Sequence, residues 1–218
     1  MYYALIGDMV ASRKLDPSAR KEAQELLRSA LAEVNREYAD SIAADFLITL
    51  GDECQGLMLA SADPVSAALR IMHSMKPYEI RFSVALGEIT TGIDRSAALG
   101  ADGPAFHAAR ERIEAMKPNH GARLRFALPE ARAEEAVNTV AALCDRLAIG
   151  RTSKQEELAY AMLRAKLKGE RLTQEALARS LGIGQSTVNA QLVSAGFNEY
   201  CEGVLYIRRE LARLGGGV

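Results

Sequence analysis

The apolar positions of residues 1–128 switch repeatedly between two spacings. Short apolar or alternating runs that end in turn residues predict strands, and apolar residues three or four positions apart predict amphipathic helices. The resulting order is strand, helix, strand, strand, helix, strand, followed by a glycine-rich connection, a helix, a strand and a last helix. The expected strands are 2–7, 46–50, 56–59, 80–89 and 123–128, and the expected helices are 18–38, 64–75, 104–116 and 130–149.

The first six of these elements follow the split βαβ order of ferredoxin-like domains. After Gly150 the pattern predicts helices alone. We therefore expect an α+β chain in which a ferredoxin-like domain, residues 1–150, precedes an all-α helix-turn-helix domain, residues 151–218.

Residues 172–192 carry the pattern of a helix-turn-helix unit. Thr173 is suited to cap a first helix, and Gly182 is suited to the positive φ that ends this helix and turns the chain. A second helix is expected from Gln185, in the position that enters the DNA major groove in such units. The expected DNA contacts are Arg179 on the first helix and Gln185, Ser186, Thr187, Asn189 and Gln191 on the second.

The charge distribution agrees with a nucleic-acid partner for this part of the chain. The formal net charge of the whole chain is −1, but residues 151–218 carry +3 and residues 1–150 carry −4. A DNA-binding unit of this kind predicts a homodimer, because two half-sites one helical turn apart need two copies. The alternative is a helical hairpin that docks on the first domain or on a partner protein.

Composition is that of an ordinary globular protein, with 49% hydrophobic and 25% charged residues. No apolar run approaches the length of a membrane span, and the start of the chain does not resemble a signal peptide. We therefore expect a cytoplasmic location and no membrane partner. Three scattered cysteines favour neither a disulfide framework nor a zinc site, and no P-loop motif is present.

Two carboxylates, Asp8 and Asp52, directly follow predicted strands. The first and second strands of a split βαβ unit run parallel, so their ends lie at one edge of the sheet and these side chains should approach each other. Paired carboxylates suit a Mg²⁺ ion that also holds nucleotide phosphates. The simpler alternatives are a strand-end carboxylate at Asp8 and ordinary turn chemistry at Asp52.

Four short sequences resemble motifs of the class III nucleotidyl cyclases. They are Asp-Met-Val-Ala-Ser at 8–12, Gly-Asp-Glu at 51–53, Ala-Leu-Gly-Glu at 85–88 and Gly-Pro-Ala-Phe-His-Ala-Ala-Arg at 103–110. The resemblance implies that Asp8 and Asp52 are metal ligands and that Arg110 contacts phosphate. The family has an Asn four residues before this Arg, where the present chain has Phe106. His107 has no counterpart there and is our own candidate for a nucleotide-pocket residue, with a hydrogen-bonded structural histidine as the alternative.

The whole chain, a cyclase-like domain followed by a helix-turn-helix unit, resembles the bacterial SatD family. These features together predict a DNA-binding transcription regulator, rather than an enzyme, whose first domain senses a nucleotide with Mg²⁺. The alternative is a nucleotidyl cyclase-like phosphoryl-transfer enzyme with a regulatory helical tail. A third hypothesis is an adaptor in which both domains bind proteins only.

Overall fold

A single five-stranded sheet organises the first part of the chain, as described by a computed structural model of residues 1–118 and 121–216. The strand order is β2-β3-β1-β4-β5; β1 is antiparallel to β3 and β4, β2 is antiparallel to β3, and β5 is parallel to β4. Thus β1 and β2 run in the same direction, and the mixed helix and strand prediction is confirmed. The strands are β1 (Tyr2–Met9), β2 (Ile42–Leu50), β3 (Glu53–Leu59), β4 (Ile80–Gly87) and β5 (Leu124–Ala127).

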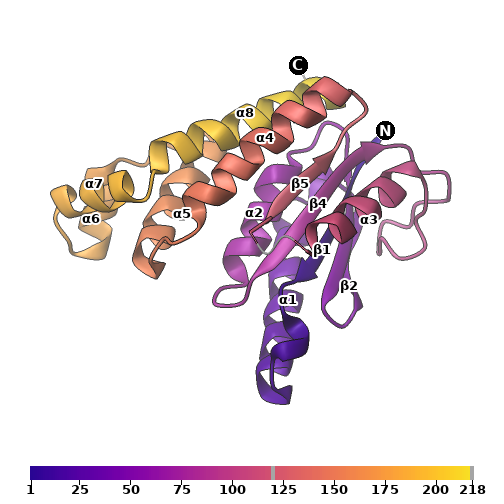
Figure 1. Ribbon diagram of the computed structural model, residues 1–218, viewed down its shortest axis with the longest axis horizontal. Coiled ribbons are helices and arrows are strands. Elements are labelled where there is room, and N and C mark those ends of the chain that lie inside the picture. The colour runs from indigo at the N-terminus through magenta and orange to yellow at the C-terminus, as the bar shows by residue number, and fades with distance from the viewer. Residues whose placement is uncertain (119–120, 217–218) are drawn as a thin grey trace.

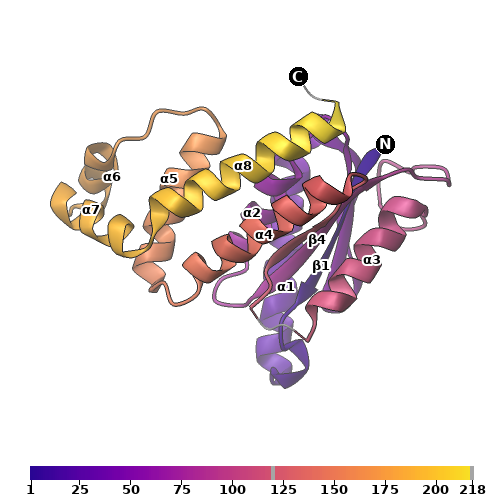
Figure 2. The same cartoon turned by 45° about the horizontal axis from the view of Figure 1, so that its top comes forward.

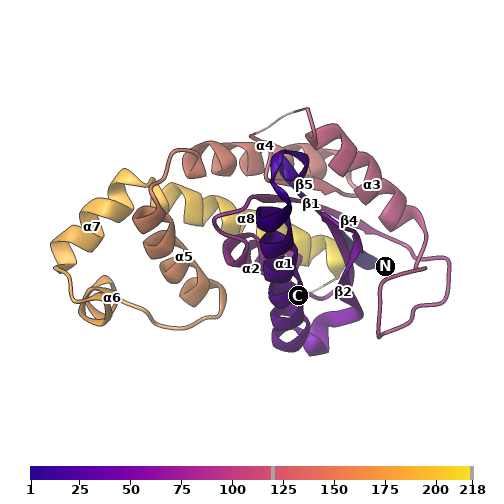
Figure 3. The same cartoon turned by 90° about the horizontal axis from the view of Figure 1, so that it is seen from below.

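Helices cover both faces of this sheet (Figure 3). Helices α1, α2 and α4 pack on one face, and α3 packs on the other. The helices are α1 (Pro17–Glu37), α2 (Pro64–Ser74), α3 (Pro104–Met116), α4 (Ala131–Ala148), α5 (Ser153–Leu167), α6 (Gln174–Leu181), α7 (Gln185–Ser194) and α8 (Phe197–Gly215), with short 3₁₀ turns at Ser12–Lys14 and Ala39–Ser41.

The helices start where the sequence predicts. The carboxylate of Asp16 accepts hydrogen bonds from the first backbone N–H groups of α1, and Asp63 does the same for α2. Each cap is followed by a proline, whose fixed φ suits the first position of a helix. These local signals explain why both helix starts could be predicted to within a residue.

Alternation along β1 divides its side chains between the two faces of the sheet. Tyr3 and Leu5 enter the core under α1 and α2, and Ala4 and Ile6 enter the smaller core under α3. Gly7 lies where a Cβ atom would come within 2.7 Å of the Phe82 ring. A larger residue would therefore push apart β1 and β4 beside Asp8, which belongs to the α3 face.

Helices α4 and α8 lie side by side across the molecule (Figures 1 and 2). The Tyr3 hydroxyl of β1 donates a hydrogen bond to the carbonyl of Leu211 in α8, with an O···O distance of 2.5 Å. Side chains of α5 to α8 belong to the same buried cluster as those of α1 and α2. The α5 to α8 segment is therefore built onto the rest of the chain, and a separate helix-turn-helix domain is not shown.

The local shape of the predicted helix-turn-helix unit is nevertheless present. Thr173 caps α6, and Gly182 ends it with a φ of 65° before α7 begins at Gln185. The proposed division at residue 150 stays a prediction; Gly150, with a φ of 87°, lies in the connection between α4 and α5. Within the described residues, no helix has the length and apolar character needed to cross a membrane.

Candidate functional site at the end of strand β1

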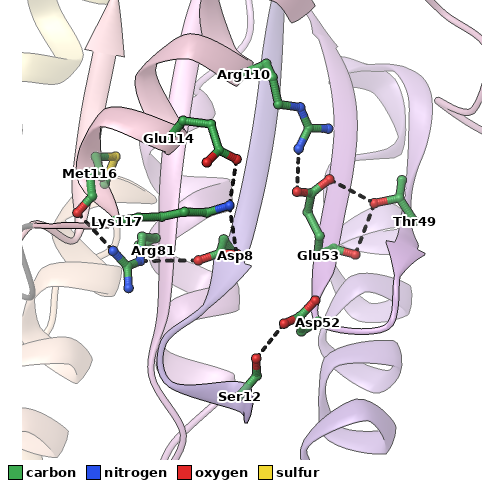
Figure 4. A network of polar contacts seen from close by, with 10 residues as sticks. All are labelled: Asp8, Ser12, Thr49, Asp52, Glu53, Arg81, Arg110, Glu114, Met116 and Lys117. Carbon is green, nitrogen blue, oxygen red and sulfur yellow. Dashed lines mark hydrogen bonds and ion pairs between the residues drawn. The ribbon is translucent and has the colours of Figure 1, made fainter.

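Three charged side chains lie next to one another across the middle of the sheet. In the strand register Asp8 is opposite Glu53 of β3 on one side and Arg81 of β4 on the other. All three belong to the face covered by α3, because residues directly opposite each other on antiparallel strands lie on the same face of the sheet. Figure 4 shows them with the neighbouring side chains of α3 and of the turn between β2 and β3.

The turn between β2 and β3 brings Asp52 to the same edge of the sheet. The backbone N–H of Met9 donates a hydrogen bond of 2.9 Å to the carbonyl of Asp52. The buried hydroxyl of Ser12 donates to the Asp52 carboxylate. Ser12 follows Ala11, which has a φ of 56°, an uncommon conformation for a residue other than glycine. The structure thus places Asp52 beside Met9, the residue after Asp8, and the joint role of the two carboxylates as metal ligands stays a prediction.

Asp8 is a largely desolvated carboxylate whose negative charge is only weakly compensated by nearby cations. Its side chain is 14% exposed, and its nearest cations are Arg81 Nε at 3.4 Å and Lys117 Nζ at 3.9 Å. Neither contact is a hydrogen bond, and Asp8 accepts none from any described side chain; the buried Nε of Arg81 is itself without an acceptor. Desolvation, together with the charges of Asp52 and Glu53, raises the pKa of Asp8 although both cations oppose the shift.

Glu53, beside Asp8, is better paired. Arg110 of α3 donates to one oxygen of its carboxylate, and the hydroxyl of Thr49 donates to the other at 3.2 Å. The guanidinium of Arg110 is 42% exposed whereas the Glu53 side chain is 8% exposed. Arg110 therefore lies at the rim of the site with solvent beside it, and its present partner is a carboxylate.

The structure brings together only part of the predicted nucleotide site. Asp8, Asp52 and Arg110 lie around one end of β1. His107 lies at the other end of α3, where it pairs with Asp102 at 2.8 Å and is 71% exposed. From His107 to Lys117 the helix rises by about 15 Å, so His107 does not reach the Asp8 carboxylate.

Sequence reasoning missed two cations of the site, Arg81 and Lys117. A signal existed for Arg81: a charged residue between Ile80 and Phe82 in a buried strand needs a partner on its own face. Its guanidinium Nη1 donates to the carbonyl of Met116 at 2.9 Å. Lys117 had no such signal, because a lysine just after a helix is ordinarily a solvated residue.

The chemistry of this edge suits a divalent cation that prefers oxygen ligands. Asp8 accepts no hydrogen bond from the side chains of residues 1–118 and 121–216, and Asp52, which accepts from Ser12, lies in the adjoining turn. Among the described residues no group of three or more His, Cys, Asp or Glu side chains forms a complete metal cage. Two carboxylates are a ligand set that Mg²⁺ commonly takes from a protein, with water and phosphate oxygens completing its shell.

The fold is that of a mixed α/β protein with two carboxylates, Asp8 and Asp52, at one end of the paired strands β1 and β3. Comparison with protein families then identifies it further. The SatD family model matches residues 2–208, and the chain belongs to the SatD family. Comparison with curated proteins gives no match.

Two solved structures of a bacterial light-regulated adenylyl cyclase are similar to part of the chain. Their sequence identities are 14% and 15%, with TM-scores of 0.46 and 0.44. Each similarity covers 57% of this chain and 42% of the cyclase chain. The chain thus corresponds to less than half the length of those proteins.

The prediction of a DNA-binding transcription regulator was wrong. One family, SatD, accounts for the sheet and for the α5 to α8 helices alike, with no separate DNA-binding unit matched at residues 172–192. The physical reason lies in charge. Helix α7 has no Lys or Arg, and Arg179 on α6 is paired with Glu175 at 2.9 Å. DNA affinity comes mainly from cations that contact phosphates.

The residues predicted to contact DNA are still at the surface. Gln185, Ser186, Thr187 and Asn189 are exposed, and Gln191 is half-buried. Exposure of short polar side chains is what the outer face of any surface helix shows. The motif therefore predicted the shape of α6 and α7 correctly but not their function.

Proposed function

We propose that the chain is a Mg²⁺-dependent, nucleotidyl cyclase-like phosphoryl-transfer enzyme that acts on a nucleoside triphosphate. The observation that carries the proposal is the pair of neighbouring carboxylates, Asp8 and Asp52, of which Asp8 is desolvated and accepts no hydrogen bond from any described side chain. Like charges held together in a partly buried place are unfavourable unless a cation joins them. Such an arrangement is more often found at functional sites than in purely structural positions.

In this proposal Asp8 and Asp52 hold Mg²⁺, which supplies charge neutralisation on phosphate oxygens. Ser12 orients the Asp52 carboxylate through its hydroxyl. Lys117 and Arg110 are 40% and 42% exposed at the rim; Lys117 pairs with Glu114 at 2.6 Å and Arg110 with Glu53, and in this proposal each exchanges its carboxylate for a phosphate. The charges of these two cations match the anionic substrate that an isolated carboxylate pair would repel.

Phe106 bears on the kind of transfer. The class III nucleotidyl cyclases, whose motifs this sequence resembles, have an Asn at the corresponding place. Here Phe106 is 6% exposed and packs in the core under α3. No polar group of this residue can contact a substrate. Two reactions remain: the 3′ hydroxyl of the same nucleotide attacks the α-phosphorus, which releases pyrophosphate and leaves a cyclic nucleotide, or water attacks the γ-phosphorus, which releases inorganic phosphate and leaves a nucleoside diphosphate.

The proposed reaction is tested by incubating the full chain with ATP or GTP and either Mg²⁺ or Mn²⁺. We expect metal-dependent turnover that is lost in Asp8→Asn and Asp52→Asn. The control is Asp40→Asn, an exposed position before β2, at the other end of that strand from the Asp52 turn. Chromatography of the products distinguishes a cyclic nucleotide from a diphosphate.

Metal binding is tested separately by titration with Mn²⁺, followed by electron paramagnetic resonance. We expect one class of site in the unmodified chain and in Asp40→Asn, and weaker binding in Asp8→Asn and Asp52→Asn. Equal binding in all four proteins would contradict the assigned ligands. Normal binding without turnover would contradict the reaction while leaving the metal site intact.

A further inference from the structure

A second cleft lies far from the Asp8 edge, where the end of α2 meets the connection between α4 and α5. Its volume is about 420 Å³, within the range of sites for small organic molecules. We call it the junction cleft, because residues from both sides of position 150 form it. The lining residues used below are His73, Lys76, Arg151, Ser153, Glu156 and Glu157.

Arg151 is the most deeply placed charge of the junction cleft. Its side chain is 4% exposed. Its Nε donates to the carbonyl of Ala195 at 3.0 Å, and its guanidinium lies 4.3 Å from the centre of the Tyr200 ring. The remaining contact is from Nη1 to Glu156 at 3.4 Å. These three contacts hold the guanidinium in one place.

One nitrogen of this fixed guanidinium, Nη2, is buried and meets no acceptor among the described residues. The Nδ1 atom of His73, on the α2 side, is in the same situation. The His73 ring is also fixed, because it stacks on Tyr160 with 3.6 Å between ring centres. Buried polar atoms are nearly always paired, so two unpaired ones in one cleft indicate a missing partner.

Ordered water is the simplest such partner, and the structure has room for it in one place. A smaller chamber of about 20 Å³ behind the cleft is also lined by His73 and Arg151, and that volume suits one water molecule. The junction cleft itself is some twenty times larger. A small organic molecule therefore fits in the cleft.

The charges around the cleft select the kind of molecule. Glu156 is already shared between Arg151 and Arg123, which lies 3.9 Å away. Lys76 lies on the rim and is exposed. Among the lining residues Lys76 and Arg151 balance Glu156 and Glu157, and Arg123, which lines the smaller chamber behind the cleft, adds one further positive charge. The first turn of α5, which begins at Ser153 on the rim, adds the positive end of a helix dipole.

We propose that the junction cleft binds a small organic anion, whose carboxylate or phosphate group accepts a hydrogen bond from Nη2 of Arg151. The site is independent of the reaction proposed at Asp8. It joins α2 to α5, so a bound ligand contacts both the sheet-forming part and the helical part of the chain. This is where a regulatory ligand would act if the helices of 151–218 control the first site.

The test is isothermal titration of the full chain with succinate and with glycerol 3-phosphate, in the presence of a metal chelator. We expect saturable binding of one of them, which identifies the carboxylate or the phosphate source. Arg151→Gln should weaken it by about tenfold or more, since a charge-assisted hydrogen bond is lost. Lys76→Ala should weaken it less, because this lysine is exposed.

Two variants should leave the affinity unchanged. Lys154→Ala removes a neighbouring exposed lysine of α5 that does not line the cleft, and Asp8→Asn alters the other site. Circular dichroism checks that Arg151→Gln is folded; if it is not, Lys76→Ala alone decides. The proposal is overturned if neither anion binds saturably, or if binding is the same in Lys76→Ala, in folded Arg151→Gln and in Lys154→Ala.

Discussion

The Asp8 edge and the outer face of α7 both gather polar side chains, but they do so in opposite ways. At the Asp8 edge, charged groups converge from β1, β4, α3 and the β2–β3 turn, and the two central ones, Asp8 and Arg81, are 14% and 5% exposed. On α7 the polar side chains come from one helix, carry no charge and are mostly exposed.

This difference decides which of the two regions is suited to bind a ligand. Charges interact strongly where protein replaces water, and a charged group that is poorly paired there favours a ligand that completes its pairing. Exposed amides and hydroxyls are already satisfied by water, so they add no such tendency. A motif read from one helix therefore carries less functional information than charges that the topology brings together.

The largest expected effect is at Arg81. Replacement by Met removes the cation that faces Asp8 inside the sheet and the donor to the Met116 carbonyl. Breaking a buried ion pair from one side costs about 3–5 kcal/mol, and we expect the free energy of unfolding to fall by that amount in urea titrations. The double variant Arg81→Met with Asp8→Asn should recover part of the loss.

Arg179→Met is the matched control on the helical side. The ion pair of Arg179 with Glu175 has side-chain exposures of 78% and 67%, and exposed pairs of this kind contribute little to stability. A comparable loss in Arg179→Met and Arg81→Met would remove the distinction between the two regions.

A somewhat smaller effect is expected inside α7, where neighbouring residues face in opposite directions. Leu192 is 3% exposed and Val193 is 66% exposed. Leu192→Ala should lower the free energy of unfolding by about 2–5 kcal/mol, because it leaves a cavity in the core. Val193→Ala should change it by less than about 0.5 kcal/mol. Equal effects in denaturant titrations would mean that α7 is not packed as described.

The stability of the folded chain should depend on pH through the ionisation of Asp8. Burial raises its pKa in the folded state, so ionisation of Asp8 disfavours folding. This penalty is absent below the unfolded pKa of about 3.9 and is complete above the folded pKa. In metal-free buffer, Asp8→Asn should therefore become more stable than the unmodified chain as pH rises through that window.

Thermal unfolding at a series of pH values measures this difference, with Asp40→Asn as the control that should show no such trend. Addition of Mn²⁺ at neutral pH should stabilise the unmodified chain and not Asp8→Asn. A difference between Asp8→Asn and the unmodified chain that does not vary with pH would show that desolvation of the Asp8 charge is not its origin.

Much of the fold was predictable because its signals are local. Asp63 followed by Pro64 identifies the start of α2, and Gly182 identifies the end of α6, since each acts through its own backbone neighbours. The shared direction of β1 and β2 followed from the split βαβ order, and with it the position of Asp8 and of the Asp52 turn at one edge of the sheet. The sequence also placed the chain correctly in its family.

The composition of the site was less predictable because it depends on which residues α3 brings across the sheet. Nothing local shows that Lys117 reaches toward Asp8, or that Arg110 pairs with Glu53. The sharing of one core by α8 and β1, made visible by the contact of Tyr3 with Leu211, is equally non-local. The motif at 172–192 misled because its exposed polar face agrees with a DNA-binding helix and with any surface helix.

The smallest expected effect is at His107, in the first turn of α3. His107 and its partner Asp102 are 71% and 59% exposed, so His107→Ala should change the free energy of unfolding by less than about 1 kcal/mol. It should also leave Mn²⁺ affinity and any nucleotide turnover unchanged, because the side chain is about ten helical residues from the Asp8 end. Arg110 lies one helical turn from His107. Arg110→Ala leaves the nearly buried Glu53 without its cation and should alter both the Mn²⁺ affinity and the nucleotide turnover. If His107→Ala instead weakens turnover as much as Arg110→Ala does, the substrate extends along the whole of α3, and the site is larger than the end of β1.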